Sequence, residues 1–172
     1  MTDKLIINWD EYNKTVEELA IKVHDSGFKV DLLIGIMRGG APIIDVLSRI
    51  FKIKCAYLAV ESYSGEGVED QQGQIIFSRE LSSTSHTLGG NILLCDDLSD
   101  TGLTLIKSIE WLKQYRPIRD NIKEIRTAIL WKKSKSTFEP DYCARKLKDS
   151  PWIVQPFEKY EEIRIEDIKK NR

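Results

Sequence analysis

The chain has 172 residues and nearly balanced charge, with 26 lysines and arginines against 27 aspartates and glutamates. This length suits one domain with a sizeable core, and a net charge of -1 gives no overall attraction to nucleic acid or anionic lipid. No apolar run approaches the length of a membrane span, and the N-terminus turns polar by Asn8, so we expect a cytoplasmic protein. The three widely spaced cysteines are expected to be reduced core residues.

Helices and strands are predicted to alternate along the chain. Apolar residues at helical spacing predict a helix over residues 9–23 that ends near Gly27. The further predictions, in chain order, are a strand at residues 30–36, a helix at 42–51, strands at 54–60 and 91–95, a helix from Leu103, and a strand at 125–131. This alternation predicts an α/β fold whose mostly parallel central sheet has helices on both faces. Residues 160–172 are strongly charged, which predicts a solvated helix or a partly frayed tail.

The most informative stretch covers residues 91–104, where an apolar run leads to two adjacent carboxylates, Asp96 and Asp97, and then to a turn that opens a helix. Backbone N–H groups at a helix start favour a phosphate, and Gly102 allows close approach. The carboxylates would repel a phosphate unless the ligand also offers hydroxyl groups or a cation. A sugar phosphate satisfies both requirements, whereas the P-loop and EF-hand patterns do not fit, and a plain helix cap is the alternative.

A second predicted anion site lies at residues 35–42, where a strand ends in glycines and a helix begins with Pro42 in its first turn. Arg38 adds a permanent charge with donors suited to a polyphosphate. Taken alone, this turn is equally compatible with a plain connection between a strand and a helix.

Two further regions have polar or aromatic residues in positions that suggest binding. Residues 61–88 are too long for a simple connection and suggest a lid, a binding loop or a disordered insertion with two short strands near residues 74–79. Lys132 ends an apolar strand, and Trp152 lies between two prolines. Taken alone, such residues are usually solvated or serve packing.

Together these motifs resemble the type I phosphoribosyltransferases, which bind 5-phosphoribosyl 1-pyrophosphate (PRPP). Residues 92–104 match the PRPP motif, and the end of the chain, from Pro140 to Glu158, resembles bacterial and archaeal xanthine-guanine phosphoribosyltransferases. The resemblance implies a single domain over residues 1–172 with the type I phosphoribosyltransferase fold. It also implies a flexible catalytic loop at residues 61–88 and a small purine-binding hood at residues 132–158.

The resemblance implies roles for individual residues as well. PRPP would be bound by Arg38, Gly39, Gly40, Asp96, Asp97, Asp100, Thr101, Gly102, Leu103 and Thr104. The purine would be bound by Lys132, Trp152 and Ile153. Catalytic roles would fall to Asp100 as proton acceptor and to Ser62 and Tyr63 on the mobile loop. Mg2+, the expected cofactor, would be held by Asp96, Asp97 and Glu158, and a cis peptide bond is expected between Met37 and Arg38.

The implied reaction transfers the 5-phosphoribosyl group of PRPP to N9 of guanine, xanthine or hypoxanthine, with Lys132 donating to the 6-oxo group. The family often has a serine at the position of Met37, and its better-known members have an acidic residue at Val154, which leaves the ranking of the three purines open. The expected partners are small-molecule substrates in a homodimer or homotetramer, with neither nucleic acid nor membrane. A PRPP-binding regulator of the same fold and a transferase for another nucleobase are the alternatives.

Overall fold

The structure is a computed structural model that describes residues 4–62, 75–83 and 88–170. Within these residues a seven-stranded sheet has the order β4-β3-β2-β6-β7-β8, with β5 also paired to β3. Its strands are β2 (Leu32–Met37), β3 (Cys55–Ser62), β4 (Ile75–Phe77), β5 (Ser82–Ser83), β6 (Gly90–Ser99), β7 (Ile122–Lys132) and β8 (Tyr142–Lys146). The five strands from β3 through β8 in this order pair in parallel, whereas β4 and β5 run antiparallel to β3.

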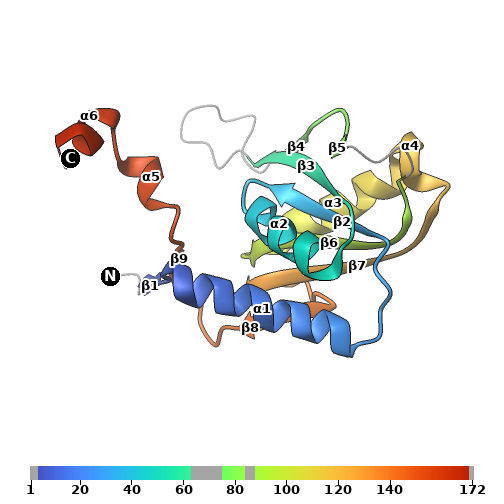
Figure 1. Cartoon of the computed structure of the whole chain (residues 1–172), viewed down its shortest axis with the longest axis horizontal. Helices are drawn as coiled ribbons and strands as arrows, with labels where there is room; N and C mark the ends of the chain where they lie inside the picture. The colour runs from blue at the N-terminus through green and yellow to red at the C-terminus, as the bar shows by residue number, and fades with distance from the viewer. Residues whose placement is uncertain (1–3, 63–74, 84–87, 171–172) are drawn as a thin grey trace.

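Helices cover both faces of this sheet (Figure 1). Successive side chains of a strand point to opposite faces, so Leu33 and Leu93 pack beneath α1 (Trp9–Asp25) and α2 (Gly40–Phe51). Their neighbours Ile34 and Leu94 pack on the other face with α3 (Leu103–Gln114) and α4 (Arg116–Arg119). The predicted fold class, a mostly parallel α/β sheet covered on both faces, is therefore confirmed.

The first helix follows the predicted pattern closely. Asn8 and Glu11 form a capping box at its start, in which each side chain accepts a hydrogen bond from the backbone of the other residue. The helix ends at Asp25, and Gly27 then takes a φ of 73°, a left-handed conformation that glycine adopts without steric cost. The apolar stripe along the helix is buried against the sheet, as its spacing predicts.

The strand that carries the acidic pair is longer than predicted. The sequence predicts that Asp96 and Asp97 follow a strand at residues 91–95, but both lie inside β6, which continues to Ser99. The reason is that β6 has a different partner on each side. Pairing with β2 stops at Cys95, whereas pairing with β7 continues to Ser99. The two carboxylates are therefore carried by a regular strand with one open edge.

A second, two-stranded sheet joins the beginning of the chain to its C-terminal third. In it β1 (Lys4–Ile6) pairs in parallel with β9 (Trp152–Val154). Beyond β9, the helices α5 (Lys159–Glu162) and α6 (Ile165–Lys170) contain no buried residue, and Figure 1 shows that they lead away from the main sheet. The charged end of the chain is thus helical and solvated as far as Lys170.

The remaining expectations concern membranes, cysteines and the long loop. No helix in the described residues is long and apolar enough to cross a membrane. The cysteines are free thiols, and burial raises the pKa values of Cys95 and Cys143. Within the segment expected to form a loop, β4 is one of the short strands predicted near residues 74–79, while residues 63–74 and 84–87 lie outside the described residues.

Candidate functional site

The carboxyl ends of β2 and β6 lie side by side and carry the two predicted anion sites. After β2 the peptide bond between Met37 and Arg38 is cis, as expected, and α2 begins at Gly40. The Arg38 side chain is 83% exposed, and its guanidinium lies 2.6 Å from a carboxylate oxygen of Glu161 on α5. The loop therefore presents the exposed Arg38 guanidinium at the carboxyl ends of the parallel strands, where ligands bind in α/β folds.

The two motifs touch through glycines. A methyl group at Gly39 would collide with the carboxylate of Asp97, and one at Gly40 would collide with the carbonyl oxygen of Cys95. Because only glycine lacks a Cβ atom, the loop after β2 can lie directly against the acidic strand β6. This contact brings Arg38, Gly39, Gly40, Asp96 and Asp97 into one region, as the sequence predicts.

The acidic pair occupies two different environments. Asp96 is 8% exposed, and burial together with the charge of Asp97 raises the pKa of its carboxyl well above the usual range. Its Oδ1 accepts a hydrogen bond from the Asp97 N–H at 2.9 Å. Asp97 accepts a hydrogen bond from the amide nitrogen of Gln155, whose own buried Oε1 has no partner among the described residues. Gln155 lies in the C-terminal stretch that resembles the xanthine-guanine enzymes, but its contact with Asp97 is visible only in the folded chain.

The predicted metal ligands are only partly brought together. In the described part of the chain no three histidine, cysteine, aspartate or glutamate side chains form a group able to hold a metal ion. The structure does not group Glu158 with Asp96 and Asp97, and its role as a metal ligand stays a prediction. Two adjacent carboxylates still fit Mg2+, which prefers oxygen donors and takes most of its ligands from water and substrate.

The turn before α3 has the form of an anion site. Gly102 caps the helix with a φ of 91°, and a methyl group there would collide with Phe138. Gly102 has no side chain that could bond the first helical turn, but Thr101 Oγ1 accepts a hydrogen bond from the Leu103 N–H at 3.3 Å. Thr104 follows in the first turn of the helix. Residues 101–104 thus place backbone N–H groups and hydroxyls at a positive helix end.

Asp100, at the start of this turn, is held between two ammonium groups. The Nζ atom of Lys133 lies 2.8 Å from Asp100 Oδ1, and that of Lys135 lies 2.8 Å from Oδ2. Partial burial alone would raise the pKa of the Asp100 carboxyl, but the two lysines outweigh it and lower that pKa below its usual value. Asp100 is therefore an ionised carboxylate at neutral pH.

The two lysines at the end of β7 point to different places. Lys132 Nζ lies 3.2 Å from the Ser136 carbonyl oxygen and 3.5 Å from a Glu139 carboxylate oxygen. Lys133 is 6% exposed, and its Nζ lies 5.9 Å from the centroid of the Trp152 ring. The structure thus brings Lys133, and not the predicted Lys132, to the aromatic residue.

The remaining predicted residues are Trp152 and Ile153 in β9, Ser62 at the end of β3, and Tyr63. Trp152 begins β9 and is 58% exposed, whereas Ile153 is 3% exposed, belongs to the core and pairs with Leu5 of β1. Ser62 is the last residue of β3. Tyr63 lies outside the described residues.

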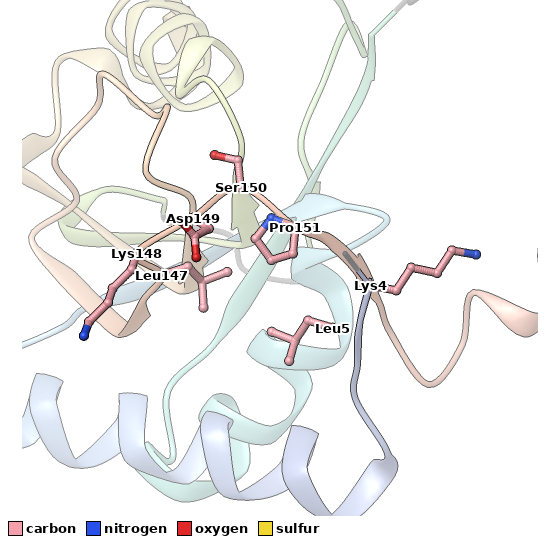
Figure 2. A pocket seen from close by; sticks show the side chains of 7 residues that line it. All are labelled: Lys4, Leu5, Leu147, Lys148, Asp149, Ser150 and Pro151. Atoms are coloured by element: carbon pink, nitrogen blue, oxygen red, sulfur yellow. The ribbon is translucent and has the colours of Figure 1, made fainter. Parts of the chain in front are cut away.

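A cavity of about 450 Å³ adjoins the segment that leads into β9 (Figure 2). It is lined by Lys4, Leu5, Leu147, Lys148, Asp149, Ser150 and Pro151. Figure 2 shows that Ser150 turns away from Leu5, and that Lys148 points in another direction.

Comparisons with known proteins identify the family and the fold. Residues 8–162 match the family described as the phosphoribosyl transferase domain. Among solved structures, a purine phosphoribosyltransferase from Pyrococcus horikoshii is 29% identical, with 90% of this chain and 94% of that one covered and a TM-score of 0.72.

Two more distant structures share the fold. The xanthine-guanine-hypoxanthine phosphoribosyltransferase of Helicobacter pylori is 21% identical, with 97% and 99% of the two chains covered and a TM-score of 0.71. A hypothetical protein from Neisseria gonorrhoeae with bound ppGpp is also 21% identical, with 100% and 96% covered and a TM-score of 0.70. With the family match extending over most of its length, the chain belongs to the phosphoribosyltransferase family and is an enzyme of the pentosyltransferase class.

Proposed function

We propose that this enzyme transfers the 5-phosphoribosyl group of PRPP to N9 of a 6-oxopurine, giving the nucleoside monophosphate and pyrophosphate in a purine salvage reaction. The observation that carries the proposal is the position of Lys133, which lies between Asp100 of the phosphate-binding turn and the exposed ring of Trp152. Transfer to a purine requires residues that bind the base beside the site for the sugar phosphate, and Lys133 with Trp152 form such a pair. The names of the Pyrococcus and Helicobacter proteins support a purine as acceptor.

In this proposal PRPP lies across the two strand ends. Arg38 and the backbone of Gly39 and Gly40 bind the pyrophosphate, and residues 101–104 bind the 5-phosphate. The carboxylates of Asp96 and Asp97 accept hydrogen bonds from the ribose hydroxyls or hold Mg2+. When bound there, Mg2+ neutralises charge on the departing pyrophosphate. Gln155 holds the Asp97 carboxylate in place by donating a hydrogen bond to it, and the same carboxylate lies against the Gly39 backbone.

Purine selection is assigned to Lys133 and Trp152. The indole of Trp152 stacks on the base, which contributes about 1–3 kcal/mol with little discrimination among bases. The ammonium of Lys133 donates to the 6-oxo oxygen, and the same ammonium would face the donor amino group of adenine. Lys133 therefore replaces Lys132 as the residue that distinguishes oxopurines from adenine. The backbone beside Ile153 is assigned to the 2-position of the purine.

The chemical step breaks the bond between C1 of the ribose and the pyrophosphate oxygen and forms a bond from the same carbon to purine N9. The sugar carries positive charge during this exchange, which the surrounding carboxylates stabilise. Asp100 accepts the proton that the purine loses, and its ionised state suits that role. Ser62 and Tyr63 are assigned to the loop that excludes water from the reacting sugar.

A panel of nucleobases tests the proposal directly. The protein is incubated with PRPP and Mg2+ and with guanine, xanthine, hypoxanthine, adenine or a pyrimidine, and pyrophosphate release is measured. Release with at least one 6-oxopurine and little with adenine is the expected result. No release with any of the three oxopurines would overturn the proposal. Release only with another base would identify a different transferase, and PRPP binding without release would indicate a regulator.

We also infer a cytoplasmic enzyme that assembles as a homodimer or homotetramer, as the resemblance to its family implies. Sedimentation velocity over a range of protein concentrations measures this assembly. A single species with the mass of one 19.8 kDa chain at all concentrations would contradict it.

A further inference from the structure

The Asp100 carboxylate has a second cation that no part of the proposed function uses. Lys133 and Lys135 approach its two oxygens at the same distance, 2.8 Å, but they differ in burial. The Lys133 side chain is 8% exposed and that of Lys135 is 51% exposed. Lys133 therefore lies inside the site beside Trp152, whereas Lys135 closes over the carboxylate from the rim.

The backbone of Lys135 is held by hydrogen bonds to the segment that leads into β9. Its N–H donates to Ser150 Oγ at 3.3 Å, and the Ser150 hydroxyl also lies 3.0 Å from Ser134 Oγ. The Ser134 N–H in turn donates to the Asp149 carbonyl oxygen at 3.2 Å. These bonds tie the turn that carries Lys135 to the segment that leads into β9.

The same turn is tied to the phosphate-binding turn on its other side. The hydroxyls of Ser136 and Ser99 lie 2.7 Å apart and both are buried. The N–H and hydroxyl of Thr137 both lie 3.2 Å from the Thr101 carbonyl oxygen. The turn that carries Lys135 thus lies between the segment that leads into β9 and the phosphate-binding turn, held there by contacts that do not involve the Lys135 ammonium group.

The two oxygens of Asp100 are not equivalent. Oδ1 is buried and lies 2.8 Å from the Nζ atom of the buried Lys133. Oδ2 faces the exposed Lys135. In the proposed reaction the Lys133 ammonium also serves the purine oxygen, so its hold on Asp100 weakens as the base binds.

We propose that Lys135 is a positioning residue, which holds Asp100 through Oδ2 so that the carboxylate stays ionised and oriented while Lys133 turns to the base. This inference rests on the proposed function. It gives the carboxylate a cation that stays in place throughout the reaction, and it assigns separate tasks to two lysines that are two positions apart.

The charge around Asp100 agrees with this division. Lys133, just beyond β7, and Lys135, in the following turn, are the charged side chains within ion-pair distance of Asp100 in the described part of the chain. Both lower the pKa of its carboxyl against the opposing effect of burial. Loss of Lys135 must therefore raise this pKa, and the ionised form then requires a higher pH.

The first test compares Lys135→Met with Lys135→Arg and with the control Lys148→Met. Lys148 is another exposed lysine of the same region, on the wall of the cavity in Figure 2. In Lys135→Met the acid limb of the pH profile of kcat/KM for the purine should move to higher pH. Its kcat near the acid limb should fall about fivefold, as expected for one partly exposed ion pair. Lys135→Arg should retain the wild-type profile.

An unshifted acid limb in Lys135→Met would overturn the inference, as would an equal shift in Lys148→Met. A second measurement does not depend on turnover: the carboxyl carbon of Asp100 is titrated by NMR, with Asp100→Asn used to identify its signal. The pKa should be higher in Lys135→Met than in the wild type, and an unchanged value would again overturn the inference. Thermal unfolding shows whether each variant is folded. Absence of pyrophosphate release in the wild type would instead refute the proposed function.

Discussion

The PRPP half and the purine half of the candidate site are built in different ways. The PRPP half consists of two turns at the carboxyl ends of neighbouring parallel strands, β2 and β6, and the turns meet through glycine backbone. The purine half collects Lys133 from beyond β7 and Trp152 from β9, which belongs to a separate two-stranded sheet. The first half is thus made of backbone held by the main core, and the second of individual side chains.

This difference predicts how each half responds to substitution. A change in the PRPP half should disturb packing and binding together, because its glycines touch β6 directly. A change at Trp152, whose ring is largely exposed, should alter the reaction with little effect on stability. Asp100 connects the halves and should have the largest effect on the reaction.

Asp100→Asn tests the connection between the halves. Loss of a proton acceptor should lower kcat by about 100- to 10,000-fold, since this is the usual contribution of a general base. The KM for PRPP should change much less, because the amide keeps the shape of the carboxylate. Steady-state kinetics with PRPP and guanine as the varied substrates measure both values. Equal losses in kcat and in PRPP affinity would mean that Asp100 serves binding only.

Lys133→Met and Lys132→Met separate the two neighbouring lysines. A charged hydrogen bond contributes about 1.5–3 kcal/mol, so Lys133→Met should lower kcat/KM for the purine by about 10- to 100-fold. Lys132 pairs with Glu139, a largely exposed carboxylate, and its replacement should change kcat/KM by less than about threefold. The comparison is made on the same 6-oxopurine with PRPP saturating. The reverse order of effects would restore Lys132 as the purine-binding lysine.

Gly40→Ala and Gly39→Ala test the backbone contact in the PRPP half. The methyl group at position 40 would meet a carbonyl oxygen of β6, which cannot move without the sheet, and should cost about 1–3 kcal/mol of unfolding free energy. At position 39 it would meet the movable carboxylate of Asp97, so stability should fall less. Urea denaturation measures the two free energies. Equal and negligible losses would show that the turn is not packed against β6 as described.

Glu161→Gln should have the smallest effect. Arg38 and Glu161 form an ion pair with side chains 83% and 55% exposed, and such pairs contribute at most about 1 kcal/mol. Freeing Arg38 should lower the KM for PRPP by no more than about fivefold, and only at low salt. Glu162→Gln, one residue along α5, is the control. An increase in the KM for PRPP would mean that Glu161 assists binding.

The sequence predicts the PRPP half well because each feature there follows from short-range geometry. An apolar strand, a glycine and a helix start within 14 residues define an anion site before any tertiary contact is known. Even there the length of β6 is underestimated, since the strand extends past Cys95 only through its pairing with β7. That pairing joins segments about 30 residues apart, and no local pattern reports it.

The purine half is less predictable for the same reason. Whether Lys132 or Lys133 faces Trp152 depends on how the end of β7 turns and on the placement of β9, which a pattern of side chains does not encode. The contacts of Lys135 and Gln155 were not predicted because their partners, Asp100 and Asp97, lie 35 and 58 positions away. A pair of adjacent carboxylates that is partly buried needs hydrogen-bond donors, but the sequence does not say which residues supply them.

The pairing of β1 with β9 has a practical consequence for anyone who makes this protein. Lys4 lies beside Trp152, and the Ile7 N–H donates a hydrogen bond to the Val154 carbonyl oxygen at 2.9 Å. The first strand therefore supports β9, which carries the Trp152 indole. An affinity tag fused directly before this strand would therefore disturb the purine half of the site and not the PRPP half. A tag attached after the solvated helices α5 and α6 is safer, because it leaves Glu161 and its ion pair with Arg38 in place.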